Sequence, residues 1–191
     1  MAPYAVLAYS MPTGPAQVRR DETEDMTQKR PHLIIVCGLP GAGKTALAMK
    51  LAPSRRAVRF SPDEWMEQLG IDIWDATARE RIETLQWMLT QELLATGTLN
   101  VIIEWGTWAR SERDLLRERG RQLGAAVELH YLEAPPEVLW GRIVARGLEA
   151  RAGSRTMTRA DLIGCCAVFE PPSDSELALY DAAEVHRGSV N

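Results

Sequence analysis

The run from Gly38 to Thr45 carries the clearest chemical signal in the chain, with the residues Gly38-Leu39-Pro40-Gly41-Ala42-Gly43-Lys44-Thr45. It matches G-x-x-x-x-G-K-[ST], a loop that joins a strand to a helix and binds nucleotide phosphates. Its small residues let backbone N–H groups approach a phosphate, and the N-terminus of the next helix adds positive potential. Lys44 would neutralise charge on the β- and γ-phosphates, and the Thr45 hydroxyl would ligate Mg²⁺. The run therefore predicts binding of ATP with Mg²⁺.

Asp63 is the second candidate, because it lies at the start of an expected helix that follows the short expected strand 57–60. The carboxyl ends of parallel strands form the edge where α/β proteins bind ligands. A carboxylate there could accept the proton of an acceptor hydroxyl during phosphoryl transfer, or hold that hydroxyl in line. Acidic residues are also favoured in the first turn of any helix. The sequence leaves both interpretations open, and it explains the neighbouring Glu64 as half of a capping box with Ser61.

Glu104 ends the apolar segment 101–103, which has the form of a Walker B strand. An acid at this place can hold Mg²⁺ directly or through water. The usual residue is aspartate, so Glu104 could serve the metal, bind the acceptor, act as a base, or be a solvated charge. Trp105 and Trp108 follow on the same edge, where their indole rings could enclose an acceptor or pack into the core.

A basic stretch over residues 142–159 carries five arginines against one glutamate, a local charge of +4 in a chain whose net charge is −4. The guanidinium groups could close over ATP and stabilise the transferring phosphoryl group, or they could form a solvated helix face. The spacing of the first two places them on one face of a helix. The arginines are Arg142, Arg146, Arg151, Arg155 and Arg159.

The chain that must position these residues has 191 residues, 46% of them apolar and 25% charged. These values fit one globular domain and exclude a largely disordered or fibrous protein. No apolar run is long enough to cross a membrane and no secretory signal is visible, so a cytoplasmic location is expected. The acidic net charge gives no global attraction to nucleic acid. The three cysteines are expected to be reduced and structural, and the three histidines are scattered and suggest no metal site.

Alternating apolar segments and helical periods predict an α/β fold with a central, mainly parallel sheet and helices on both faces. Residues 1–30 lack such a period and are expected to form an N-terminal tail, leaving 31–191 as one domain with a lid over about 142–159. One buried face is expected for the third helix, formed by Ala78, Ile82, Leu85, Leu89 and Leu93. Strands are expected at 33–37, 57–60, 99–103 and 126–132, and helices at 43–51, from 61, and at 75–96, 111–123, 136–144 and 158–169.

Together these residues resemble the P-loop kinases that include polynucleotide 5′-hydroxyl kinases, zeta toxins and chloramphenicol phosphotransferase, a group often labelled AAA-type ATPase. The resemblance covers about residues 33–169. It implies a three-layer P-loop NTPase fold, an acceptor-side base at Asp63, and lid arginines at Arg142 and Arg146 that grip ATP phosphates. The polynucleotide kinases often carry Asp-x-x-Arg, whereas Met66 stands three positions after Asp63.

The favoured function is therefore an ATP-dependent kinase that transfers the γ-phosphoryl group to a hydroxyl of a small molecule. The missing arginine after Asp63 and the acidic net charge disfavour a nucleic-acid acceptor without excluding it. The alternatives are a polynucleotide or nucleoside kinase and a nucleotide-binding ATPase switch. The sequence does not identify the acceptor, the preferred base or the oligomeric state.

Overall fold

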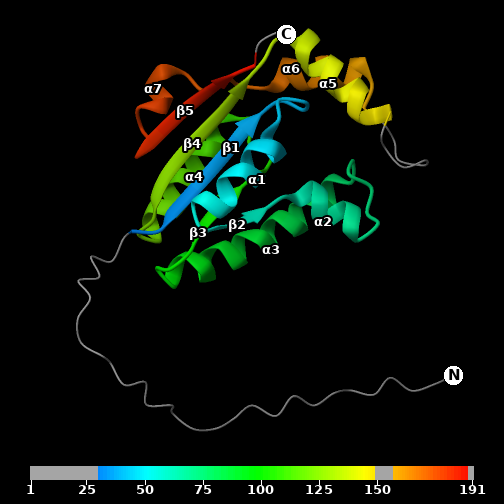
Figure 1. Ribbon diagram of the computed structural model, residues 1–191. Coiled ribbons are helices and arrows are strands. Elements are labelled where there is room, and N and C mark those ends of the chain that lie inside the picture. The colour runs from blue at the N-terminus through cyan, green and yellow to red at the C-terminus, as the bar shows by residue number, and fades with distance from the viewer. Residues whose placement is uncertain (1–29, 149–156, 189–191) are drawn as a thin grey trace, which may run out of the picture.

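The structure is a computed structural model that describes residues 30–148 and 157–188. Successive strands are separated by one to three helices, and Figure 1 shows their arrangement. In chain order they are β1 (His32–Gly38), α1 (Lys44–Ser54), β2 (Ala57–Phe60), α2 (Pro62–Gln68), α3 (Ala76–Ala95), β3 (Asn100–Ile103), α4 (Arg110–Gln122), β4 (Ala126–Glu133), α5 (Pro136–Leu148), α6 (Arg159–Val168), α7 (Asp174–Leu177) and β5 (Ala182–Arg187).

The described strands form one parallel sheet in the order β2-β3-β1-β4-β5, which confirms the expected α/β class (Figure 1). The central strand β1 is buried on both faces, which is why its sequence is apolar without alternation. One face packs against a core that includes Leu94 of α3 and Leu116 of α4. The other packs against Ala48 of α1, Leu139 of α5 and Leu162 of α6. The result is the expected three-layer arrangement.

The expected strands are present with ends that differ by at most one residue, but no sequence pattern predicted α7 or β5. Strand β5 has the sequence AAEVHR and lies at the sheet edge, where it pairs only with β4. Four of its six residues are exposed, so no apolar period marks it. Its place in the fold depends on pairing with β4 and not on a local pattern.

The expected buried face of α3 was wrong in part. Ile82, Gln86, Thr90 and Leu94 are buried, at intervals of four, while the side chains of Leu85 and Leu89 are exposed. Two polar residues of this face are buried, and each makes a side-chain hydrogen bond. Thr90 donates to the Gln86 carbonyl, and the Gln86 amide oxygen accepts from Trp105. An apolar periodicity alone does not predict buried polar residues of this kind.

The helix cap that was expected at α6 is present, and the one that was expected at α2 is not. Thr158 and Asp161 form the capping box of α6. Ser61 makes no side-chain cap bond at α2, so the capping box that was expected to explain Glu64 is absent. Helix α4 begins at Arg110, one residue before the expected Ser111, and the Glu112 carboxylate accepts from the Ala109 N–H.

No helix within residues 30–148 and 157–188 is long and apolar enough to span a membrane. Residues 1–29 of the expected tail and residues 149–156 of the expected lid lie outside the described residues. Arg151 and Arg155 are among them.

Candidate functional site

The loop between β1 and α1 has the backbone that close approach to a phosphate requires. Gly38 and Gly41 both have positive φ values, of 147° and 80°. A Cβ atom would lie 2.7 Å from the Leu132 carbonyl oxygen at Gly38, and 2.7 Å from the Leu139 carbonyl oxygen at Gly41. Any side chain at either position would therefore force the loop away from β4 or α5.

Lys44 is the first residue of α1, and its ammonium folds back over the same loop. Its Nζ donates to the carbonyl oxygens of Gly38, at 2.9 Å, and Leu39, at 3.2 Å. Burial lowers the pKa of this ammonium, while the charges of Asp63 and Glu104 act in the opposite direction. The three charged groups thus lie close enough to influence one another, as their common position at the C-terminal edge of the sheet predicted.

Thr45 and Glu104 meet directly. The Thr45 hydroxyl donates to Glu104 Oε1, and Arg59 Nη1 donates to Glu104 Oε2 at 2.7 Å. Arg59 also forms an ion pair with Glu64. The sequence reasoning missed Arg59, although a lone charge in the otherwise apolar strand β2 was the available signal. It also gave Glu64 no role beyond a cap, which the absent cap bond corrects.

The oxygen atoms of Thr45 and Glu104 fit a magnesium ion. Mg²⁺ prefers hard oxygen ligands and is usually held by one or two protein groups together with water and substrate phosphates. Glu104 is 7% exposed, and its contacts with Thr45 and Arg59 hold its carboxylate oxygens beside the loop. The two residues assigned to the metal from the sequence are therefore adjacent to each other and to the phosphate loop.

Asp63 is exposed in the first turn of α2 and forms an ion pair with Arg79 of α3. Arg79 is a second residue that the sequence reasoning missed. It comes from the next helix along the chain, whereas the Asp-x-x-Arg pattern would place an arginine at position 66, where the buried Met66 packs instead. No local pattern could reveal it, because 16 residues separate the partners.

Helix α5 covers the loop and brings one of the two expected lid arginines to it. Arg142 Nη1 donates to the Ala42 carbonyl at 3.2 Å. Arg146 is exposed one turn later, and its charge acts on Lys44. Arg159, at the far end of the expected lid, instead forms an ion pair with Glu137. A closed lid over residues 142–159 stays a prediction.

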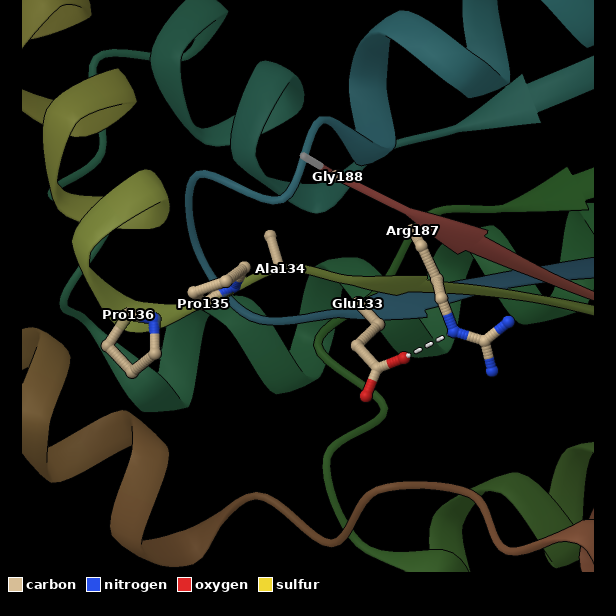
Figure 2. Close-up of a pocket in the computed structure, with 6 residues that line it drawn as sticks. All are labelled: Glu133, Ala134, Pro135, Pro136, Arg187 and Gly188. Carbon is tan, nitrogen blue, oxygen red and sulfur yellow. Dashed lines mark hydrogen bonds and ion pairs between the residues drawn. The ribbon is translucent and has the colours of Figure 1, made fainter. Parts of the chain in front are cut away.

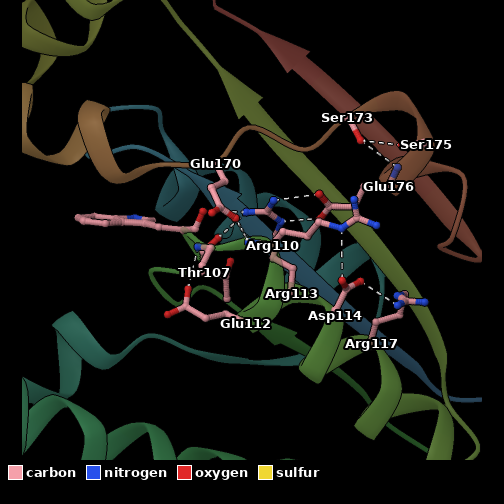
Figure 3. Close-up of polar contacts among 12 residues, drawn as sticks. Thr107, Arg110, Glu112, Arg113, Asp114, Arg117, Glu170, Ser173, Ser175 and Glu176 are labelled. Atoms are coloured by element: carbon pink, nitrogen blue, oxygen red, sulfur yellow. Dashed lines mark hydrogen bonds and ion pairs between the residues drawn. The ribbon is translucent and has the colours of Figure 1, made fainter.

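The loop after β3 is held by a buried ion pair (Figure 3). The Arg113 guanidinium donates to both carboxylate oxygens of Glu176, at 2.7 and 3.0 Å. It also donates to the carbonyl oxygens of Thr107 and Trp108. Trp105 and Trp108 are half-buried against the core. This packing corresponds to the expected alternative in which the indoles pack into the core. Their role as a wall of an acceptor pocket stays a prediction.

A hollow of about 450 Å³ lies at the C-terminal ends of β4 and β5 (Figure 2). Its lining is Glu133, Ala134, Pro135, Pro136, Arg187 and Gly188. Arg187 Nε donates to Glu133 at 3.2 Å across it. The hollow adjoins the phosphate loop, because a Cβ on Gly188 would lie 3.2 Å from the Arg142 guanidinium that contacts Ala42.

The histidines are not scattered, contrary to the sequence interpretation. His130 of β4 and His186 of β5 form a pair with their ring nitrogens 3.0 Å apart, and Glu184 lies beside both. Parallel pairing of β4 with the unforeseen strand β5 brings them together.

Comparisons with known proteins agree with this arrangement. A family model described as "AAA domain" matches residues 33–172. An adenylate kinase of Deinococcus radiodurans is 30% identical over 148 residues, which cover 71% of this chain and 74% of that protein.

Solved structures share the fold. A candidate kinase from Chloroflexus aurantiacus J-10-fl has a TM-score of 0.63 and 24% identity, over 83% of this chain and 89% of its own. A gluconokinase from Sinorhizobium meliloti 1021 has a TM-score of 0.54 and 21% identity, over 85% of this chain and 86% of its own. The resemblance to P-loop kinases inferred from the sequence is thereby confirmed.

Proposed function

The chain belongs to the AAA domain family, and from this premise we propose that it is a kinase that transfers the γ-phosphoryl group of ATP to a hydroxyl of a small molecule. One observation carries the proposal. Lys44, Thr45 and Glu104 gather around the phosphate loop, with Asp63 near enough for its charge to act on Lys44. Groups for the phosphates, a metal and an acceptor thus occupy one edge of the sheet.

The nucleotide would bind with its phosphates in the loop 38–45 and its base in the hollow beside Pro135 and Gly188. Apolar walls with a few polar groups suit a planar base. Arg142 already contacts the loop, so it needs little movement to reach a phosphate oxygen. Mg²⁺ held by Thr45 and Glu104 would neutralise charge on the β- and γ-phosphates.

In the proposed reaction the acceptor oxygen forms a bond to the γ-phosphorus while the bond from that phosphorus to ADP breaks. Asp63 accepts the hydroxyl proton, and its ion pair with Arg79 holds the carboxylate in place. Lys44 and Arg142 stabilise the charge on the phosphoryl oxygens. Most of the catalysis in such transfers comes from positioning and electrostatics, which is what these residues can supply.

Arg79 favours a second candidate, in which the acceptor itself carries a phosphate. A guanidinium beside the proposed base would bind that phosphate in a bidentate manner. The D. radiodurans relative is named as an adenylate kinase, which agrees with a nucleotide acceptor. The absence of arginine at position 66 therefore argues less strongly against phosphate-bearing acceptors than the sequence suggested.

The test is formation of ADP and of a phosphorylated product when the protein and Mg-ATP are incubated with one acceptor class at a time. The classes are uncharged polyols and sugars, nucleoside monophosphates, and a 5′-hydroxyl oligonucleotide, with product detected by mass spectrometry. Turnover with the first class supports the proposal. Turnover with nucleoside monophosphates alone supports the second candidate, and ADP formation independent of every acceptor indicates an ATPase switch.

Salt separates the nucleic-acid outcome from the others. Binding of a single strand should weaken with a slope of about −0.7 per neutralised phosphate in a plot of log affinity against log salt. A small hydroxyl acceptor should show little dependence. Efficient labelling of the oligonucleotide with a steep salt dependence would contradict the proposed acceptor class, and the Lys44→Ala variant controls for a contaminating kinase.

A further inference from the structure

His130, Glu184 and His186 form a cluster that the proposed phosphoryl transfer does not use. His130 pairs with Glu184 in the register of β4 and β5, and His186 follows two residues later on the same strand face. These two strands lie side by side along the sheet edge (Figure 1). The cluster therefore depends on backbone pairing and not on flexible loops.

The two imidazoles face each other through nitrogen atoms. His130 Nδ1 lies 3.0 Å from His186 Nε2, with ring centroids 5.3 Å apart and planes inclined by 17°. Two nitrogens bound to one tetrahedral zinc ion are about 3.3 Å apart, since each Zn–N bond is about 2.0–2.1 Å. The observed separation is thus close to that of a shared metal ion.

Glu184 supplies a third donor. One of its carboxylate oxygens lies 3.6 Å from His130 Nδ1, and ligand atoms of the three residues all lie within 4.8 Å of one another. Its side chain is 63% exposed, compared with 7% for His130 and 26% for His186. The cluster is therefore built on a buried imidazole and is open to solvent on the Glu184 side.

A further carboxylate fixes the orientation of the buried imidazole. Glu128 Oε2 lies 3.7 Å from His130 Nε2, on the ring side opposite to His186. Glu128 is itself held by an ion pair with Arg55 and by a contact with His32 Nδ1. A carboxylate behind a histidine favours the proton on the facing nitrogen and leaves the other lone pair free for a metal. Here that free nitrogen is Nδ1, which faces His186.

We propose that His130, His186 and Glu184 bind one divalent transition-metal ion of the zinc class, with water completing a tetrahedral site. Two imidazoles and one carboxylate suit Zn²⁺, whereas Mg²⁺ prefers an all-oxygen set. The site is thus chemically distinct from that of Thr45 and Glu104. On binding, the proton between the imidazoles moves to His186 Nδ1, which lies 3.6 Å from Glu184 Oε1, so both rings stay neutral.

The bound ion would fasten the edge strand β5 to β4. Strand β5 leads directly to Gly188, which lines the hollow beside Arg142. A cross-link at His186 would therefore stabilise one wall of that hollow. A ligand that binds only the folded chain raises its unfolding temperature in proportion to the logarithm of ligand concentration.

The experiment is calorimetric titration of the full chain with ZnCl₂, in the presence of excess MgCl₂ and without nucleotide. We expect one equivalent of zinc to bind, with a rise in unfolding temperature. Replacement of groups behind a metal ligand commonly costs about 10- to 100-fold in affinity, so His186→Asn should lose at least about 100-fold. Glu184→Gln alters an exposed side chain, so it should weaken binding while the fold is kept. Glu118→Gln changes an exposed carboxylate on α4 and should bind zinc as the wild type does.

Cobalt provides an independent readout of the donor atoms. Co²⁺ in the same site should give visible absorption bands of a tetrahedral nitrogen and oxygen set, and these should vanish in His186→Asn. The proposal is overturned if His186→Asn and Glu184→Gln both bind zinc as tightly as the wild type does. It is also overturned if excess Mg²⁺ displaces the zinc. A strong near-ultraviolet sulfur-to-cobalt band would also overturn it, because it would place the metal on cysteines.

Discussion

Asp63 and Arg79 show how a single ion pair changes the interpretation of a site. The carboxylate lies at the edge where the sequence placed it, but its charged partner comes from another helix. That partner can hold the carboxylate toward an acceptor oxygen and can also bind an anionic acceptor. The same pair therefore bears on both the proposed base and the acceptor class.

Asp63→Asn tests the assigned base. The amide keeps the size of the side chain but cannot accept the proton, so turnover should fall about 10²–10⁴-fold while ATP affinity persists. Stability should change by less than about 1 kcal/mol, because the Asp63 side chain is largely exposed. Steady-state kinetics and calorimetry on one variant measure both quantities. Glu67→Gln, an exposed change on the same helix, is the matched control, and equal turnover in the two variants would remove Asp63 from the mechanism.

The loop after β3 is positioned by a connection between elements. Arg113 of α4 joins Glu176 of α7 and the carbonyls of Thr107 and Trp108, so helix α7 supports the loop that follows β3 (Figure 3). Both charged side chains are buried, at 0% and 1% exposure. Such a pair is costly to break because the remaining charge stays desolvated.

Arg113→Met should lower the free energy of unfolding by about 3–5 kcal/mol, because it leaves Glu176 buried without its partner. The double variant Arg113→Met, Glu176→Leu should be more stable than this single variant, since it removes the orphaned charge as well. Urea unfolding of the wild type and the two variants measures the difference. A double variant that is no more stable than the single one would contradict a desolvated pair.

Glu128 joins β4 to β1 and α1, and it gives the sheet an acid-sensitive contact. Burial alone would raise the pKa of its carboxyl, but contacts with His130, Arg55 and His32 outweigh burial and lower the pKa from 4.5 to about 2. A lowered carboxyl pKa stabilises the fold above the unfolded value, and that stabilisation is lost as the pH falls from about 4.5 to about 2.

Glu128→Gln should therefore be less stable than the wild type at neutral pH, by up to about 3 kcal/mol, and the difference should shrink between pH 4.5 and 2. Denaturant unfolding across this range, with a chelator present to exclude metals, provides the comparison. A difference in unfolding free energy that does not vary with pH would show that the carboxylate is not stabilised in its charged form.

At the scale of the whole molecule, the sequence predicted what is encoded locally. The phosphate loop, its flanking strand and helix, and the acids at 63 and 104 follow from short patterns whose spacing fixes their place. The features that were not predicted depend on contacts between different elements of the fold. They are Arg59, Arg79, the Arg113–Glu176 pair and the paired histidines His130 and His186. Strand β5 is the common cause of several omissions, because an exposed edge strand has no apolar period to detect it.

The central claim is that the loop from Gly38 to Thr45 binds the phosphates of ATP through Lys44, and calorimetry with Mg-ATP tests it most directly. A charged hydrogen bond contributes about 1.5–3 kcal/mol, so Lys44→Ala should weaken binding about 10- to 100-fold. Lys50→Ala removes an exposed lysine from the same helix and should bind as the wild type does. If Lys44→Ala binds Mg-ATP as tightly as Lys50→Ala, or the wild type fails to bind at millimolar concentration, the account is contradicted.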